Sequence, residues 1–190
     1  MMLCKWEALP DNMRLDAVRP YYDLLSQKRL SLAVKRLFDF GTALVLLVLL
    51  APVILILSVI VRLDSKGAAI YSQERVTQYG RSFKIYKFRT MVEGADRLGA
   101  QVTSGNDSRI TKVGRVLRKT RLDELPQLFN ILAGDMSLVG TRPEVPRYVR
   151  EYTPEMMATL LLPAGVTGET SILFKDEAAV LDEAEDVDKT

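Results

Sequence analysis

The adjacent carboxylates Asp123 and Glu124 are the residues of this chain best suited to carry chemistry. They lie within the segment 118–130, where basic residues precede them and a short stretch with helical apolar periodicity follows. The chain has no histidine, so a Ser–His–Asp triad and an HExxH metalloprotease site are excluded. Its one cysteine, Cys4, can form neither an intrachain disulfide nor a cysteine-based zinc site. A carboxylate is therefore the leading candidate for any catalytic role.

The dyad also has a purely structural interpretation. Acidic residues in the first turn of a helix are stabilised by the helix dipole, by about 0.3–1 kcal/mol each. Thr120 precedes Asp123 in a Thr-x-x-Asp arrangement that resembles a capping box, and Pro126 is tolerated only in a first helical turn. The sequence thus predicts a helix that begins very near the dyad. On these grounds the two carboxylates can be a helix cap, a catalytic pair or both.

Two glycine-bearing loops follow the dyad, at 132–144 and 164–168. Glycine lets the backbone approach a ligand closely. The first loop carries Arg142, whose planar guanidinium suits phosphate oxygens. Two acids, several basic residues and two such loops beside a membrane segment could form a site for a metal-bound phosphate ester.

The membrane segment is the uncharged stretch 40–61, which is long enough to cross a bilayer. It is not a typical signal peptide, because it starts too far into the chain and lacks a small-residue cleavage site. A buried core helix is the alternative, although a helix apolar on all sides rarely suits so small a domain. Pro52 should kink or break the helix near its middle, and the basic residues on both flanks favour the cytoplasmic face. We therefore expect a helix–break–helix hairpin that enters one leaflet and returns, with a single kinked span as the alternative.

The other segments predict a small α+β domain that is mostly helical. Residues 21–37 fit an amphipathic helix, either at the lipid headgroups or packed on the domain. Residues 69–76 and 82–88 read as a β-hairpin around a turn at 78–81. Its polar face would hold Arg75, Lys84 and Lys87, and such a face is often simply solvated. A helix over 89–98 and a loop over 101–111 would follow.

Composition limits the function classes. The net charge of +2 is too small to indicate a nucleic-acid partner, and neither a GxGxxG nor a Walker-type phosphate loop is present. A lone cysteine fits a reducing, cytoplasm-facing location. We expect four parts: an N-terminal extension (1–34) with the amphipathic helix, the hairpin (35–63), a cytosolic catalytic domain (64–175) and an acidic tail (176–190).

Several ordered motifs together make the chain similar to one family. They are the Lys-Arg-Leu-Phe-Asp run at 35–39, the proline-containing apolar segment, and the stretches 73–75, 83–91, 122–130 and 134–143. From about residue 35 to 168 the chain resembles the monotopic phosphoglycosyl transferases, the bacterial sugar transferase family. The resemblance implies a re-entrant membrane hairpin with its break at Ala51 and Pro52. It also implies a location at the cytoplasmic face of the bacterial inner membrane.

The resemblance further implies an activity. The enzyme would transfer a sugar phosphate from a UDP-sugar to a polyprenyl phosphate such as undecaprenyl phosphate, and release UMP, at the start of glycan assembly. Asp123 would be the nucleophile of a ping-pong cycle with a covalent phosphosugar intermediate, and Glu124, with Asp123, would bind Mg²⁺. The side chains expected to bind phosphate are Arg118, Arg142, Lys87 and Arg89. A homodimer is a further expectation, because residues 30–63 could pack against a second copy.

The chain departs from the family pattern at three places. Ala51-Pro52 stands where many relatives have Ser-Pro, Gly140-Thr141-Arg142-Pro143 where Gly-Pro-Arg-Pro is usual, and 163–168 lacks a usual arginine. Relatives also usually continue beyond a position equivalent to Thr190. One-step transfer without an adduct, and a non-catalytic membrane-seated interaction module, are the alternatives. A membrane-attached nucleic-acid binder is disfavoured by the balanced charge.

Overall fold

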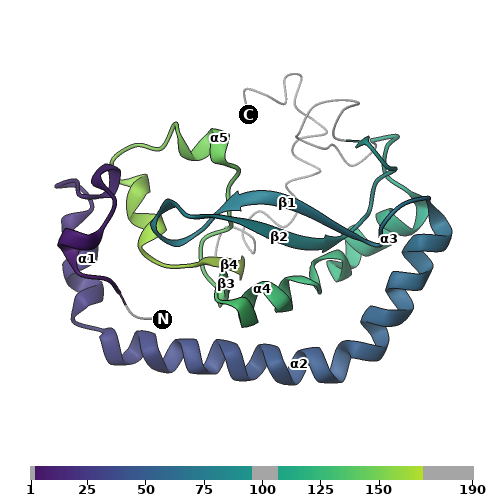
Figure 1. Ribbon diagram of the computed structural model, residues 1–190, viewed down its shortest axis with the longest axis horizontal. Coiled ribbons are helices and arrows are strands. Elements are labelled where there is room, and N and C mark those ends of the chain that lie inside the picture. The colour runs from purple at the N-terminus through teal and green to yellow at the C-terminus, as the bar shows by residue number, and fades with distance from the viewer. Residues whose placement is uncertain (1–2, 96–106, 169–190) are drawn as a thin grey trace.

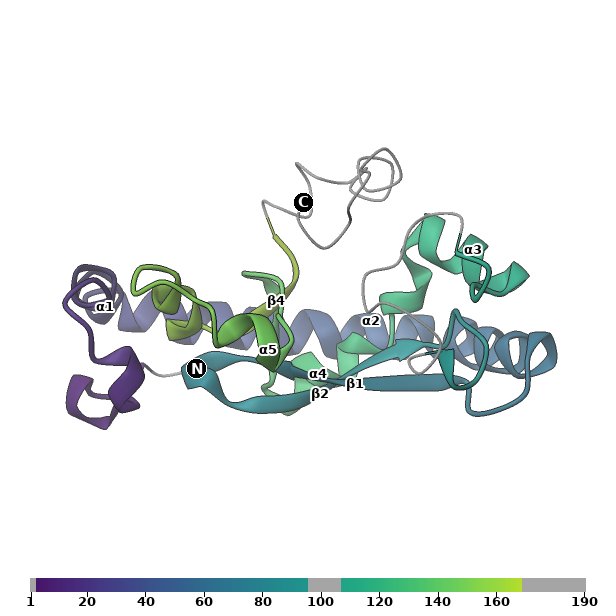
Figure 2. The same cartoon turned by 90° about the horizontal axis from the view of Figure 1, so that it is seen from above.

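The computed structural model describes residues 3–95 and 107–168. Within these ranges the protein is a mixed helix and sheet structure, which confirms the expected α+β class. One long helix, α2 (Arg29–Asp64), follows one side of the molecule, and the other elements lie on one side of it (Figures 1 and 2). The acidic tail expected at 176–190, and segments 96–106 and 169–175 of the expected catalytic domain, lie outside the described residues.

Helix α2 spans Arg29–Asp64 without interruption and contains Pro52 in its interior. The break expected at Ala51 and Pro52 is therefore not present, although α2 bends in its C-terminal part (Figure 1). Proline removes only one backbone hydrogen bond, to the carbonyl of Val48, and a helix can accommodate this loss by bending. Ser58 Oγ also donates to the carbonyl of Ile54 at 2.7 Å, a contact that often bends helices. The re-entrant hairpin is not confirmed and stays a prediction.

The outer face of α2 is apolar and exposed along its length. Only 6% of its most apolar window is buried in the protein, so the buried-core alternative is wrong. The helix is long and apolar enough to cross a membrane, by length and composition. The exposed apolar residues are Leu30, Val34, Leu37, Phe38, Phe40, Leu44, Val45, Val48, Leu49, Val53, Leu55, Ile56, Val59, Ile60 and Leu63.

The inner face of α2 packs on the domain in both halves. In the first half Ala43 is fully buried, in a cluster with α4 (Gln127–Ala133) and β3 (Met136–Val139). In the second half Val61 is buried against the end of β2 (Ser82–Phe88) and α3 (Lys112–Thr120). The helix is therefore held from both sides of Pro52 by one and the same domain.

Polar contacts fix the first half of α2. The Arg36 guanidinium donates to the carbonyls of Ile131 and Leu132, at 2.7 and 3.3 Å, and so satisfies the last turn of α4. Asp39, only 2% exposed, accepts hydrogen bonds from Ser137 Oγ at 2.7 Å and from the Leu138 backbone N–H at 3.3 Å. Asp39 also pairs with Lys35 at 2.9 Å.

Polar contacts fix the other end of α2 as well. Arg89 donates to the carbonyl of Ser65 at 2.6 Å and to that of Val61 at 3.4 Å. Asp64 accepts from the backbone N–H of Val113, the second residue of α3, at 3.3 Å. Arg89 thus caps the C-terminus of α2.

The β-hairpin prediction is confirmed. Strands β1 (Ile70–Val76) and β2 pair antiparallel around a 3-10 turn at Gln78–Gly80. The common polar face expected for Lys84 and Lys87 is wrong, because side chains alternate along a strand. Lys87 lies on the inward face with the buried Phe83 and Ile85, and Lys84 is exposed on the other face.

A second, parallel pair joins β3 to β4 (Ala164–Thr167). In the chain, the two strands are separated by α5 (Pro146–Val149) and a 3-10 helix, Met156–Leu161. This 3-10 helix packs on the N-terminal segment, which comprises 3-10 turns at Trp6–Ala8 and Asp11–Met13 and helix α1 (Arg19–Ser26). The single helix expected over 21–37 is wrong: α1 ends at Ser26 and α2 begins at Arg29.

The helix expected over 89–98 is not present at 89–94, and Ala95, the last described residue before the gap, lies in a 3-10 turn. Met91 instead forms an isolated bridge with Ile110, and helix α3 begins at Lys112. Thr111 caps α3 by accepting from the Gly114 N–H at 2.9 Å. Gly114 is buried against the backbone of Thr90, so α3 and the residues after β2 lie in close contact.

Asp39→Asn tests the anchor in the first half of α2. Replacing a carboxylate oxygen by an amide leaves one of the donors Ser137 Oγ and Leu138 N–H without an acceptor, so the purified protein should lose about 1–3 kcal/mol of unfolding free energy. Thermal or denaturant unfolding in detergent measures the loss. Asp16→Asn, at an exposed position, is the matched control. Equal stability of the two variants would show that this anchor contributes nothing.

Gly114→Ala tests the contact between α3 and the end of β2. A Cβ on Gly114 would lie 2.1 Å from the carbonyl oxygen of Thr90, so we expect a loss of about 1–3 kcal/mol in stability. No heavy atom would lie within 4 Å of a Cβ on Gly41, and Gly41→Ala should be neutral or stabilising by up to about 1 kcal/mol. Comparable melting temperatures for both variants would contradict this prediction.

Candidate active site

The dyad lies in a 3-10 turn, Leu122–Glu124, between α3 and α4. Arg121 ends α3 in the left-handed conformation, with φ 58°. Thr120 Oγ1 donates backward to the carbonyls of Val116 and Leu117, at 2.9 and 3.2 Å, so the predicted capping box is wrong. Helix α4 begins only at Gln127, after Pro126. The dyad is therefore held in a tight connection between two helices.

Asp123 is nearly buried, at 8% exposure, and its Oδ1 has no hydrogen-bond partner among the described residues. Burial raises the pKa of Asp123 above its usual range, while the nearby positive charges of Lys87 and Arg118 oppose that rise. An unpaired carboxylate oxygen in a poorly solvated site is costly unless a ligand uses it. Asp123 thus has the properties of a nucleophile or of a metal ligand.

Glu124 has a different environment from its neighbour. Its Oε1 accepts a hydrogen bond from Lys87 Nζ at 2.9 Å and lies 3.6 Å from a terminal nitrogen of Arg142. Burial favours the neutral acid, but the charges of Lys87 and Arg142 outweigh it and lower the pKa of Glu124. Adjacent carboxylates with pKa values shifted in opposite directions can take different roles.

Three of the four predicted phosphate-binding residues lie at the dyad. Lys87 comes from the end of β2, and burial lowers its pKa although Glu124 opposes the shift. Arg118, on the last turn of α3, is positioned by a 2.8 Å bond from its Nε to Thr90 Oγ1, and its charge acts on Asp123. Arg142 follows β3. The described contacts of Arg89 lie instead at the C-terminus of α2, so the structure does not bring it to the dyad.

A cleft of about 290 Å³ opens on the Glu124 side of the dyad. Its polar residues are Arg121, Glu124, Arg142 and Thr167. Its apolar residues are Leu125, Leu128, Ile131, Leu138 and Val166. Sequence reasoning did not single out Arg121, because a left-handed arginine at the end of a helix has no pattern in the sequence beyond the basic run itself.

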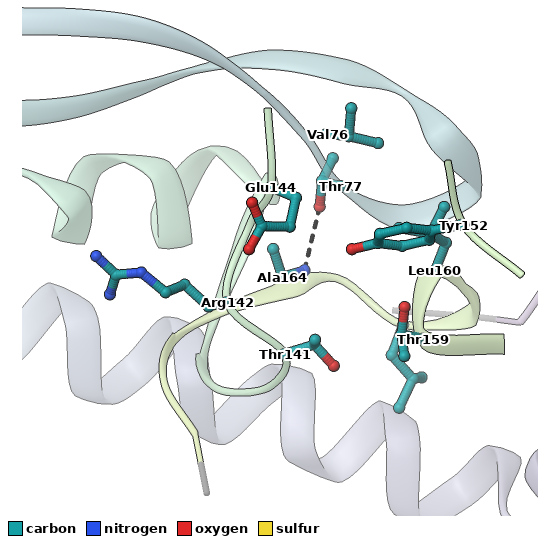
Figure 3. Close-up of a pocket in the computed structure, with 10 residues that line it drawn as sticks. Val76, Thr77, Thr141, Arg142, Glu144, Tyr152, Thr159, Leu160 and Ala164 are labelled. Carbon is teal, nitrogen blue, oxygen red and sulfur yellow. Dashed lines mark hydrogen bonds between the residues drawn. The ribbon is translucent and has the colours of Figure 1, made fainter. Parts of the chain in front are cut away.

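A small pocket lies on the other side of the Arg142 loop (Figure 3). Its volume of about 10 Å³ leaves room for about one water molecule. Thr77 Oγ1 accepts a hydrogen bond from the Ala164 N–H there at 3.2 Å. Burial and the charge of Glu144 raise the pKa of Tyr152, and the side chain of Arg142 extends away from this group (Figure 3). The pocket is therefore too small for a substrate and supports the loop instead.

Arg75 is a positioning residue that sequence reasoning missed. Its guanidinium donates to the carbonyl of Pro143 at 3.1 Å and to Gln73 Oε1 at 2.8 Å. The next residue, Val76, donates its N–H to the carbonyl of Glu144 at 2.9 Å. Strand β1 thus fixes the loop that carries Arg142. The sequence signal for this role was the Gln-Glu-Arg run at 73–75, which matched the family but was assigned no role.

The dyad offers two carboxylates, which are the kind of oxygen ligand that Mg²⁺ prefers. No group of three or more His, Cys, Asp or Glu residues that could hold a metal occurs in the described part of the chain. Mg²⁺ needs fewer, because it is commonly bound by one or two carboxylates together with substrate phosphates and water. The unpaired Oδ1 of Asp123 is an oxygen of the required kind.

Comparisons with known proteins place the sequence in a family. Residues 30–189 match the sequence model of the bacterial sugar transferase family. The chain is 45% identical, over 125 residues, to a Bacillus subtilis protein whose name carries the provisional assignment undecaprenyl-phosphate N-acetylgalactosaminyl 1-phosphate transferase; the match covers 66% of this chain and 70% of that protein.

Two further relatives are longer. The chain is 39% identical to the UDP-N-acetylgalactosamine-undecaprenyl-phosphate N-acetylgalactosaminephosphotransferase of Aeromonas hydrophila, and 40% identical to the undecaprenyl-phosphate galactose phosphotransferase of Salmonella typhimurium. Each match covers 74% of this chain but only 34% and 33% of those proteins. The family match spans most of the sequence and includes the dyad, its basic neighbours and α2. The chain therefore belongs to the bacterial sugar transferase family.

Proposed function

We propose that this protein transfers a sugar 1-phosphate from a UDP-sugar to undecaprenyl phosphate or a similar polyprenyl phosphate, with release of UMP. The observation that carries the proposal is the buried Asp123 with its unpaired Oδ1, beside Lys87 and Arg118. The names of the relatives support a polyprenyl phosphate acceptor and a sugar-phosphate transfer.

In the first step Asp123 Oδ1 attacks the phosphorus next to the sugar. A bond forms between this oxygen and the phosphorus, the phosphorus–oxygen bond to UMP breaks, and UMP leaves with the electron pair. A carboxylate and a diphosphate repel each other, and the charges of Lys87 and Arg118 beside Asp123 offset that repulsion. In the second step an oxygen of the lipid phosphate attacks the same phosphorus and the carboxylate is released.

Magnesium is part of this proposal. Asp123 and Glu124 would hold Mg²⁺, which when bound would neutralise charge on the diphosphate and on the departing UMP. Lys87 and Arg142 keep Glu124 ionised, the form that a cation requires.

We also propose that α2 enters only one leaflet, from the cytoplasmic face of the inner membrane. A span would place the two ends of a helix about 30 Å apart, on opposite sides of the hydrocarbon layer. Arg36 and Asp39 near one end, and Asp64 and Ser65 at the other, contact the same small domain. A re-entrant or in-plane helix satisfies both sets of contacts and keeps the dyad at headgroup level.

Asp123→Asn should remove covalent catalysis. Wild-type protein incubated with Mg²⁺ and a UDP-sugar labelled in its sugar-proximal phosphate should acquire label and release UMP before lipid is added. The variant should acquire none and lose turnover by about a thousandfold or more. Asp135→Asn, in an ion pair with Arg81 elsewhere on the domain, is the matched control and should keep both properties.

The same assay separates the alternatives. If wild-type enzyme turns over but releases UMP only when lipid is present, and carries no label, transfer occurs in one step. If no UDP-sugar yields UMP with or without lipid, the protein is not a transferase of this kind.

The topology of α2 can be tested with single cysteines in a Cys4→Ser background. Lys28→Cys and Lys66→Cys place thiols at exposed positions before and after α2. A re-entrant helix predicts that a membrane-impermeant maleimide labels both in inside-out vesicles and neither in intact spheroplasts. Labelling of the two positions from opposite sides would establish a span.

A further inference from the structure

The residues that line the cleft beside Glu124 include two chemically distinct groups, which we call its charged end and its apolar end. Arg121 and Arg142 supply positive charge at one end. Leu138 and Val166 form the apolar end, and both pack against the apolar cluster of α2, α4, β2 and β3. A volume of about 290 Å³ is at the lower end of the range for small-molecule sites. The cleft suits a ligand whose charged group is joined directly to an apolar chain.

The apolar end of the cleft is continuous with the membrane helix. Leu138 and Val166 pack in the same apolar cluster as Leu46, Leu47 and Leu50 of α2. The neighbouring outer positions of α2, among them Val48 and Leu49, are each 67% exposed. The apolar end of the cleft and the middle of α2 therefore belong to one apolar cluster.

Arg121 is held at the charged end by its backbone. A left-handed conformation is unfavourable for arginine, and helices that end this way usually place glycine there. The guanidinium makes no hydrogen bond or ion pair with another described residue, although its charge acts on Glu124. Strain of this kind is typical of binding sites.

We propose that this cleft is the subsite for the acceptor lipid, with the first isoprene units on the wall formed by Leu138 and Val166. This inference rests on the proposed function. The lipid phosphate would lie between Arg121 and Arg142, and the rest of the chain would continue along α2 into the bilayer. The wall, rather than the charged end, then selects an isoprenoid phosphate over a soluble one.

Two in-line displacements at one phosphorus explain why the charged end cannot distinguish the substrates. The attacking and leaving oxygens lie on opposite sides of the phosphorus in each step. The acceptor phosphate must therefore approach from the side that UMP has left, so both phosphates use the same arginines in turn. Only the apolar wall is specific to the acceptor, and a test must address the wall.

Val166→Thr and Val166→Phe make that test. Threonine keeps the shape of valine but adds a hydroxyl, and phenylalanine keeps the wall apolar but fills the cleft. We expect KM for undecaprenyl phosphate to rise about threefold or more in the first variant and about tenfold or more in the second. In Val166→Thr, which leaves the cleft open, the rate of UMP release from UDP-sugar without lipid should stay within about twofold of wild type. Val139→Thr, on β3 but 58% exposed, is the matched control and should change neither value.

The outcomes are separable. If Val166→Thr slows UMP release as much as lipid transfer, the wall serves the donor and the inference is wrong. Farnesyl phosphate, a shorter isoprenoid phosphate, is a second acceptor for the same assay. If Val166→Thr leaves KM unchanged for both undecaprenyl and farnesyl phosphate, the wall does not contact the lipid. This result decides the question even if Val166→Phe does not fold. Crosslinking with a photoreactive polyprenyl phosphate is independent of turnover. Crosslinked label near Leu138 and Val166 supports the subsite, even if the protein uses no UDP-sugar as a substrate. Label confined to other segments overturns the subsite.

Discussion

The attachment of both ends of α2 to one small domain is the constraint on which the rest of the structure depends. Arg36 and Asp39 hold the first half, and Arg89 and Asp64 hold the C-terminal end. The apolar outer face then has no protein partner among the described residues, while the inner face packs in the core with α4, β2 and β3. Proline can remain inside the helix because one lost hydrogen bond is tolerated by bending, whereas a fully open break in hydrocarbon would leave several backbone groups unpaired.

Charge around the dyad is divided so that its two carboxylates differ. Glu124 takes the nearest contacts of both Lys87 and Arg142, and Asp123 is left with an unpaired oxygen in a buried position. Burial alone would raise the pKa of both acids. The cations reverse that effect at Glu124 and only reduce it at Asp123. Under the proposed function Glu124 can remain an anion for a cation to bind, while Asp123 keeps an oxygen available to attack phosphorus.

Local patterns in the sequence were sufficient for the hairpin, because alternation and a turn signal fix a two-stranded unit without distant contacts. They failed where a distant contact decides. Thr120 reads as an N-cap but lies at the end of α3, since the left-handed Arg121 stops that helix first. Arg89 reads like Arg118, yet its position one residue after β2 directs it to the C-terminus of α2. The dyad and the basic residues Lys87, Arg118 and Arg142 were identified in advance, but only the fold shows which carboxylate each one faces.

The position of the cleft beside α2 also has an energetic reason under the proposed function. A lipid phosphate that reaches the dyad must draw its first isoprene units out of the bilayer. Exposure of each CH₂ group to water would cost about 0.8 kcal/mol, so one five-carbon unit left unprotected would lose several kcal/mol of binding. The wall at Leu138 and Val166 replaces lipid contacts with protein contacts over that distance. An apolar wall that joins the membrane helix to the charged end therefore lets the phosphate leave the bilayer without exposing the chain to which it is attached.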